Sequence, residues 1–63
     1  MTLADFLKHS RNTYVYVYDE LSGDCIMQGT DNSVLHTENC EDYIVDNFNA
    51  GFYGKPVIYV EVL

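Results

Sequence analysis

Two stretches of the chain alternate between residue types with a period of two, which is typical of β-strands. From Tyr14 to Tyr18 the chain reads Tyr-Val-Tyr-Val-Tyr, so three tyrosines lie on one face and two valines on the other. This alternation predicts a strand over residues 13–19. Residues 57–63 alternate in the same way, with one aliphatic face and one mixed face that carries Tyr59. A second strand is therefore predicted there.

A β-hairpin is predicted around the turn that follows the tyrosine-rich strand. Residues 20–24 contain glycine and short polar side chains, which suit a turn, and residues 25–29 can form the return strand. A connection this short permits only antiparallel pairing. We expect Val15, Val17 and Ile26 to point into the core and the tyrosines to point away from it.

A short helix is predicted over residues 2–9, before the hairpin. Thr2 is a suitable N-cap, and Asp5 follows three residues later, as in a capping box. Lys8 and His9 fall in the last turn, where cations suit the negative end of the helix dipole.

A second helix is predicted to start at Thr37 or Asn39 and to end at Ala50-Gly51. One of its faces is mostly apolar, with residues at i, i+3 and i+4 spacing. That face consists of Cys40, Tyr43, Ile44, Asn47 and Phe48. The preceding residues 30–37 fit either a single helical turn or a loop.

The predicted order is helix, strand, strand, helix, strand, within one domain of 63 residues. We therefore expect an α+β two-layer sandwich, in which both helices cover the valine and isoleucine face of a three-stranded, mainly antiparallel sheet. No uninterrupted apolar run approaches the roughly 20 residues that cross a bilayer. Nothing resembles a secretory signal peptide. We expect a cytoplasmic protein in which Cys25 and Cys40 are free thiols.

The charge of the chain bears on its partners. Ten acidic and three basic residues give a formal net charge of -7. Such a charge repels nucleic acid and anionic membranes and favours basic protein surfaces, including the phosphate-binding grooves of nucleic-acid enzymes. Plain solubility is the alternative explanation.

One candidate site is a stripe of carboxylates on the second predicted helix. Residues four apart on a helix lie roughly 6 Å apart along its axis, which is close to phosphate spacing, and no lysine is interleaved. The stripe either imitates nucleic-acid phosphates for a basic groove or is the solvated outer face of an amphipathic helix. Its members are Glu38, Glu41, Asp42 and Asp46.

The second candidate site is the tyrosine face of the sheet, formed by Tyr14, Tyr16 and Tyr18 with Tyr59 beside them. Aromatic side chains on a sheet can stack bases, but such platforms are paired with a positive groove, for which this chain lacks cations. Tyrosine is also enriched at protein interfaces. We therefore expect protein contact, including self-association, with a tyrosine ladder on a solvated face as the alternative.

No pattern in the chain predicts catalysis, a metal or a cofactor. The soft ligands Cys25, Cys40, His9 and His36 match no zinc spacing. The stretch 31–33 lacks the glycine and the terminal glutamate of a calcium loop. We expect no catalytic residues, and an enzyme is not predicted.

A short capped helix followed by YVYVYDELSGDCIMQGT and then by KPVIYVEVL resembles the small acidic accessory proteins of phages and other mobile elements. The resemblance is one of architecture and charge pattern, and it spans most of the chain. It implies inhibition of host defence, as in anti-CRISPR and antirestriction proteins that mimic DNA, with the carboxylate stripe as the mimic. Ten carboxylates are fewer than heavily charged mimics display, and the tyrosine face has no role in pure charge mimicry.

Two functions are therefore predicted. The first is a protein-binding inhibitor that occupies a basic groove of a host defence or nucleic-acid enzyme, without direct contact to nucleic acid or membrane. The alternative is a homo-oligomeric structural or regulatory module, such as a homodimer, that associates through its tyrosine face or its sheet edges.

Overall fold

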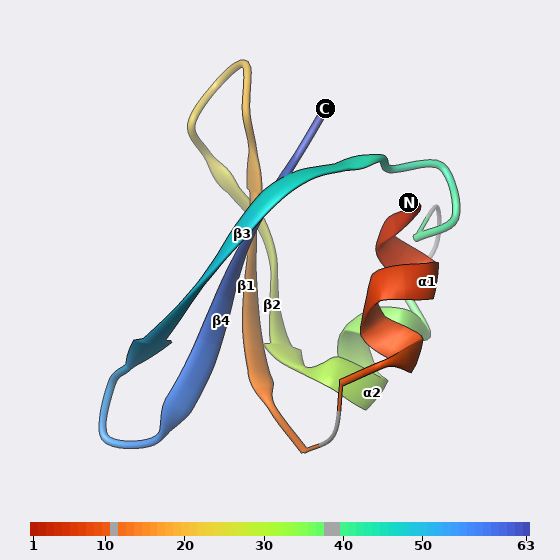
Figure 1. The fold of residues 1–63 in the computed structure, drawn as a ribbon. Coiled ribbons are helices and arrows are strands. Elements are labelled where there is room, and N and C mark those ends of the chain that lie inside the picture. The colour runs from red at the N-terminus through yellow and green to blue at the C-terminus, as the bar shows by residue number, and fades with distance from the viewer. Residues whose placement is uncertain (11, 38–39) are drawn as a thin grey trace.

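A computed structural model of the chain describes residues 1–10, 12–37 and 40–63. Its elements are α1 (Leu3–Lys8), β1 (Tyr14–Asp19), β2 (Cys25–Thr30), α2 (Asp31–Leu35), β3 (Val45–Phe52) and β4 (Pro56–Val62). The strands form one sheet in the order β2-β1-β4-β3, and both helices lie on the same side of it (Figure 1). The α+β class is confirmed, whereas the prediction of a three-stranded sheet is wrong.

The two central strands, β1 and β4, run parallel, and each has an antiparallel neighbour on its outer side. The parallel register places Val17 beside Val60 and Tyr16 beside Tyr59. Side chains of paired residues point to the same face of a sheet. The predicted separation of an aliphatic face from a tyrosine face is therefore confirmed, and it extends across both central strands.

The core lies between the helices and the aliphatic face. Its buried members are Leu3, Ala4, Leu7, Val15, Val17, Val34, Cys40, Val60 and Val62. Ile26, which we expected in this core, is 37% exposed. The hairpin register places Met27 opposite Val17, so the half-buried Met27 packs on the core instead, and the register shift that follows this pair leaves Ile26 without a partner in β1.

The first helix begins as its sequence predicts. The Thr2 Oγ1 accepts a hydrogen bond from the backbone N–H of Asp5 at 3.1 Å. Two further backbone hydrogen bonds join this end of the chain to the start of β3. The Leu3 N–H donates to the backbone carbonyl of Tyr43 at 2.9 Å, and the Val45 N–H donates to the backbone carbonyl of Met1 at 2.9 Å. The N-terminal residues thereby hold α1 against one edge of the sheet.

The segment that fitted either a helical turn or a loop contains the short helix α2. Thr30 caps it, because the Thr30 Oγ1 accepts a hydrogen bond from the Ser33 N–H at 3.2 Å. Val34 points from this helix into the core. The helical alternative is therefore confirmed.

The largest correction concerns the helix predicted from Thr37 or Asn39 to Ala50-Gly51. Asn39 lies outside the described residues, and Glu41 and Asp42 lie in a turn. The chain then extends into β3, which pairs antiparallel with β4 as the fourth strand. The helix prediction is wrong over the part of this segment that the structure describes.

The sequence of that segment fits both the helical spacing of i, i+3 and i+4 and the period of two that is typical of a strand, and the structure follows the period of two. In β3, Phe48 and Ala50 lie on the helix side of the sheet, while Asn49 and Gly51 lie on the opposite face. Asparagine and glycine are poor helix formers, and phenylalanine favours strands. The edge of β4 that faces away from β1 also needs hydrogen-bond partners. β3 supplies them, because only a short turn separates it from β4.

Two leucine-to-alanine variants test the position of the core. Leu7 is 2% exposed and Leu21 is 91% exposed. We expect Leu7→Ala to lower the free energy of unfolding by about 2–5 kcal/mol, because it leaves a cavity between α1 and the sheet. Alanine keeps the helix propensity high, so the loss reports packing.

The matched control is Leu21→Ala, which should change the free energy of unfolding by less than about 0.5 kcal/mol. Urea unfolding followed by circular dichroism measures both values. Similar losses in the two variants would contradict the described core.

Candidate protein-binding face

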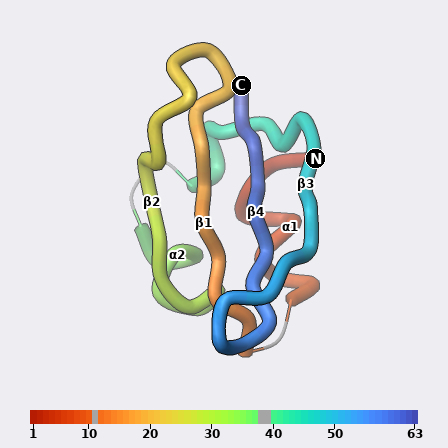
Figure 2. Tube along the Cα trace, turned by 90° about the vertical axis from the view of Figure 1, so that its left-hand side faces the viewer, coloured from red at the N-terminus to blue at the C-terminus, as the bar shows by residue number. Residues whose placement is uncertain are grey.

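The face of the sheet opposite the helices carries a row of tyrosine rings. Figure 2 views the molecule from this side, with all four strands in front of the helices. The ring centroids of Tyr14 and Tyr16 are 5.2 Å apart, those of Tyr16 and Tyr59 are 5.4 Å apart, and those of Tyr18 and Tyr59 are 6.4 Å apart. The structure thus brings together all four tyrosines that the sequence predicts as one site, and each is half-exposed.

Tyr59 is held between its two neighbouring strands. Its ring stacks on Tyr16 with an interplanar angle of 16°. On the other side, a Cβ added to Gly51 would lie only 2.7 Å from the Cε2 of Tyr59. The ring therefore occupies the space that any side chain at position 51 would need, and covers the glycine of the edge strand. This explains why glycine stands inside β3, where we had predicted a helix end.

A cation from the same chain covers one end of the row. The Lys55 Nζ lies 4.1 Å from the centroid of the Tyr14 ring, within the range of a cation–π contact. Lys55 lies in the turn between β3 and β4, and the parallel register places Val57 beside Tyr14. The sequence analysis missed this contact, because it depends on the pairing of β1 with β4.

Carboxylates gather at the opposite end of the row. A hydrogen bond with the Asp46 carboxyl raises the pKa of Glu20 above its ordinary value of 4.5, and burial and the charges of Asp46 and Glu61 raise that pKa further. Glu20 follows β1, Asp46 lies on β3 and Glu61 lies on β4. Three separate segments therefore meet at this acidic end. Of these carboxylates, the sequence analysis had named only Asp46.

A shallow hollow of about 350 Å³ lies at this acidic end of the tyrosine face. It is lined by Tyr18, Asp19, Glu20, Gly23, Asn49, Tyr59 and Glu61. The hollow combines the aromatic residues Tyr18 and Tyr59 with the acidic residues Glu20 and Glu61, so it suits a cationic group that also has apolar or planar surface.

The predicted carboxylate stripe does not exist as a helical row in the described residues. Glu38 lies outside them. Glu41 and Asp42 are exposed in a turn, and Asp46 is exposed at the register shift near the start of β3. Because β3 is a strand, the helical spacing on which the stripe depended is wrong. Asp46 belongs instead with Glu20 at the acidic end.

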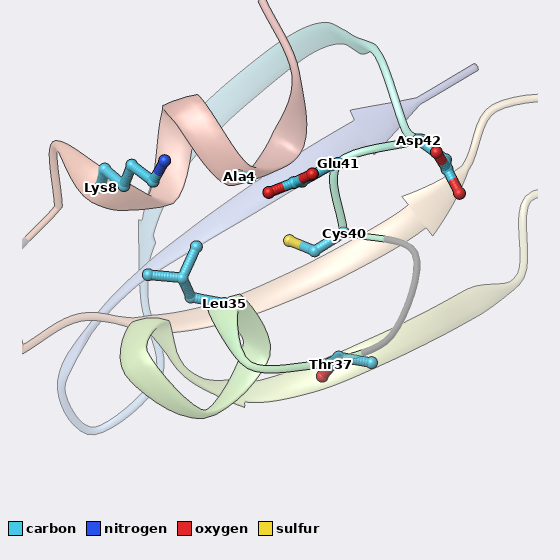
Figure 3. A pocket seen from close by; sticks show the side chains of 7 residues that line it. All are labelled: Ala4, Lys8, Leu35, Thr37, Cys40, Glu41 and Asp42. Atoms are coloured by element: carbon cyan, nitrogen blue, oxygen red, sulfur yellow. The ribbon is translucent and has the colours of Figure 1, made fainter.

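A second hollow, of about 390 Å³, lies on the helix side of the sheet. Figure 3 shows the Cys40 thiol pointing toward Leu35, with Glu41 nearby and Lys8 on the helix across from it. Burial, and after it the charge of Glu41, raises the pKa of the Cys40 thiol. A thiol that stays protonated is a weak nucleophile, so this hollow does not present an activated cysteine.

Both cysteines are free, Cys40 in the core and Cys25 exposed on β2. Within residues 1–10, 12–37 and 40–63, no three histidine, cysteine or acidic side chains lie close enough together to hold a metal ion. None of the helices in these same residues has the length and apolar character needed to cross a bilayer.

Comparisons of the chain with protein-family models, with curated proteins and with solved structures give no match.

The raised pKa of Glu20 makes the stability of the protein depend on pH. The native state favours the protonated carboxyl, so the stability that this group contributes is present below about pH 4.5 and is lost as the pH rises through its folded-state pKa. We expect Glu20→Gln to raise the urea midpoint near neutral pH, because it removes a carboxylate that its neighbours repel. This gain should shrink as the pH falls towards about 4.5.

The control for this prediction is Asp42→Asn, which removes the same charge from an exposed turn. Urea midpoints of the native chain and both variants, measured from acid to neutral pH, test the assignment. An equal gain from Glu20→Gln at every pH would show that this carboxyl titrates alike in the folded and unfolded states.

Proposed function

We propose that this chain is a protein-binding module that contacts a basic surface of another protein through its tyrosine face and the acidic end of that face. The observation that carries the proposal is the row of four half-exposed tyrosine rings on the face of the sheet opposite both described helices. A row of this kind has a large, rigid surface with hydroxyl groups, which is favourable at protein interfaces.

The charge of the module favours a basic partner. The formal net charge is -7, and the carboxylates of Glu20, Asp46 and Glu61 lie together at one end of the tyrosine row. Opposite charges across an interface speed up encounter and exclude partners of the wrong sign. Binding should therefore weaken strongly as the salt concentration rises.

The basic surface that we propose as the target is the nucleic-acid groove of an enzyme, as in the anti-CRISPR and antirestriction proteins that the sequence resembles. Such grooves carry the lysine and arginine residues that contact phosphates. Carboxylates at the acidic end would take the place of phosphates, with the tyrosines as apolar anchors beside them. A module bound in this way would inhibit the enzyme by occupying its groove.

Matched charge variants distinguish the tyrosine face from the helix side of the molecule. We expect Glu61→Gln and Asp46→Asn each to weaken binding to a captured partner by about threefold to thirtyfold, because each removes a carboxylate from the acidic end. The matched controls are Glu41→Gln and Asp42→Asn in the exposed turn, and these should leave binding unchanged.

The partner is first captured on the immobilised chain at low salt and released at high salt. Calorimetry or surface plasmon resonance with the purified partner then compares the four variants at two salt concentrations. If the turn variants weaken binding and the face variants do not, the proposed binding face is wrong.

Self-association is the second candidate function, and an open strand edge favours it. β3 lies at the edge of the sheet, and its Phe48 and Phe52 are 58% and 75% exposed. An edge strand presents unpaired backbone groups that can pair with a second copy. Antiparallel pairing of two β3 strands would cover both phenylalanines of each copy.

Sedimentation at micromolar concentration tests this candidate. We expect a dimer for the native chain and a monomer for Phe52→Lys, because a lysine on an edge strand opposes pairing between copies. Leu21→Ala, which removes an exposed apolar side chain from a turn, is the control and should leave the dimer intact. A native chain that stays monomeric throughout the concentration range would remove this candidate.

A further inference from the structure

We infer that the hollow at the acidic end of the tyrosine face binds the guanidinium group of an arginine side chain. This inference rests on the proposed function, since it names the group of the basic partner that the face would contact. Two tyrosines, Tyr18 and Tyr59, and the carboxylates of Glu20 and Glu61 line the hollow.

The aromatic rings of the hollow suit a planar cation. The ring centroids of Tyr18 and Tyr59 are 6.4 Å apart, with an interplanar angle of 32°. Both residues are half-exposed, so part of each ring remains open to a ligand. Guanidinium groups stack on aromatic faces, and their fixed N–H donors match carboxylates, whereas an ammonium group is a compact and strongly hydrated point charge.

The opposite end of the same row shows how this surface accommodates a cation. There the Lys55 ammonium lies 4.1 Å from the centroid of Tyr14. At the end that carries the hollow, the charged lining residues are all carboxylates: Asp19, Glu20 and Glu61. The chain thus supplies a cation to one end of the tyrosine row, while the other end has carboxylates and open rings.

The carboxylates around the hollow are crowded, and a cation would relieve their repulsion. Glu20 is adjacent to Asp19 in the chain and interacts with Asp46 of β3 and Glu61 of β4, and its raised pKa reflects these last two neighbours. A bound guanidinium favours the charged form of Glu20. Binding should therefore strengthen as the pH rises from about 4.5 towards neutral.

The size and composition of the hollow favour an organic cation. Its volume of about 350 Å³ is far larger than a single ion needs. Its carboxylates also fall outside any cluster that could hold a metal ion, as far as the described residues extend. A guanidinium at the end of an apolar stem fits both the rings and the carboxylates of this site.

The test is a titration of the folded chain with N-acetylargininamide, followed by two-dimensional NMR of the backbone amides. N-acetyllysinamide at the same ionic strength is the comparison ligand. We expect saturable shifts confined to the residues that line the hollow, and arginine should bind about two to five times more tightly than lysine.

Four variants connect the binding to the hollow. Tyr59→Leu and Glu61→Gln should each weaken argininamide binding by about twofold to fivefold. The matched controls are Tyr53→Leu in the β3–β4 turn and Glu41→Gln on the helix side, and these should bind as the native chain does. Glu61→Gln keeps the tyrosine packing intact, so it tests the inference even if Tyr59→Leu perturbs the fold.

The inference is overturned by shifts that spread over all acidic residues, by equal binding of arginine and lysine, or by unchanged binding in both hollow variants. These outcomes are separable from failure of the proposed function. A partner that depends on Asp46 and Glu61 while argininamide does not bind would overturn the arginine site alone. Argininamide binding in the hollow, with a partner that is insensitive to the face variants, would overturn the proposed function alone.

Discussion

The parallel pairing of β1 with β4 is the interaction on which the rest of this structure depends. Its register puts Val17 beside Val60 and, on the other face, Tyr16 beside Tyr59. The hydrogen bonds between β1 and β4 thus complete the aliphatic face of the sheet on which the helices pack, and they also bring the tyrosines together in one row. A shift by one residue would place tyrosines under the helices and valines in solvent, so both faces oppose slippage. Core and candidate site are therefore fixed by the same pairing.

The sequence could predict the elements whose signals are local. The cap at Thr2, the alternation around Val15 and the hairpin turn each depend on neighbouring residues, and all three are present in the structure. The strand β3 could not be predicted in this way, because its alternation is interrupted near Asp46 and overlaps an equally regular helical spacing. Only the open edge of β4 decides between the two patterns, and that edge exists only once the sheet has formed.

The candidate site likewise has one part that the sequence could predict and one part that it could not. Alternation alone assigns each of the four tyrosines to the polar side of a strand with a clear aliphatic face, whereas the place of Tyr59 beside Tyr16 depends on the pairing of β1 with β4. The acidic end could not, since Glu20, Asp46 and Glu61 come from three segments that meet only through the strand order. Gly51 illustrates the same limit. In sequence it is a suitable helix end, and only the ring of Tyr59 lying over it shows why it has no side chain.

The central position of β4 also has a consequence for synthesis. Tyr14 pairs with Val57, so β1 is synthesised long before its parallel partner exists. At ordinary rates of translation the delay is roughly 2–9 s. During that time an uncharged stretch of high strand propensity has only its hairpin partner, which is the condition that favours aggregation. Asp19 and Glu20 follow that stretch directly and can act as gatekeepers in the nascent chain. Crowded carboxylates that are unfavourable in the folded state would then protect the chain before it folds.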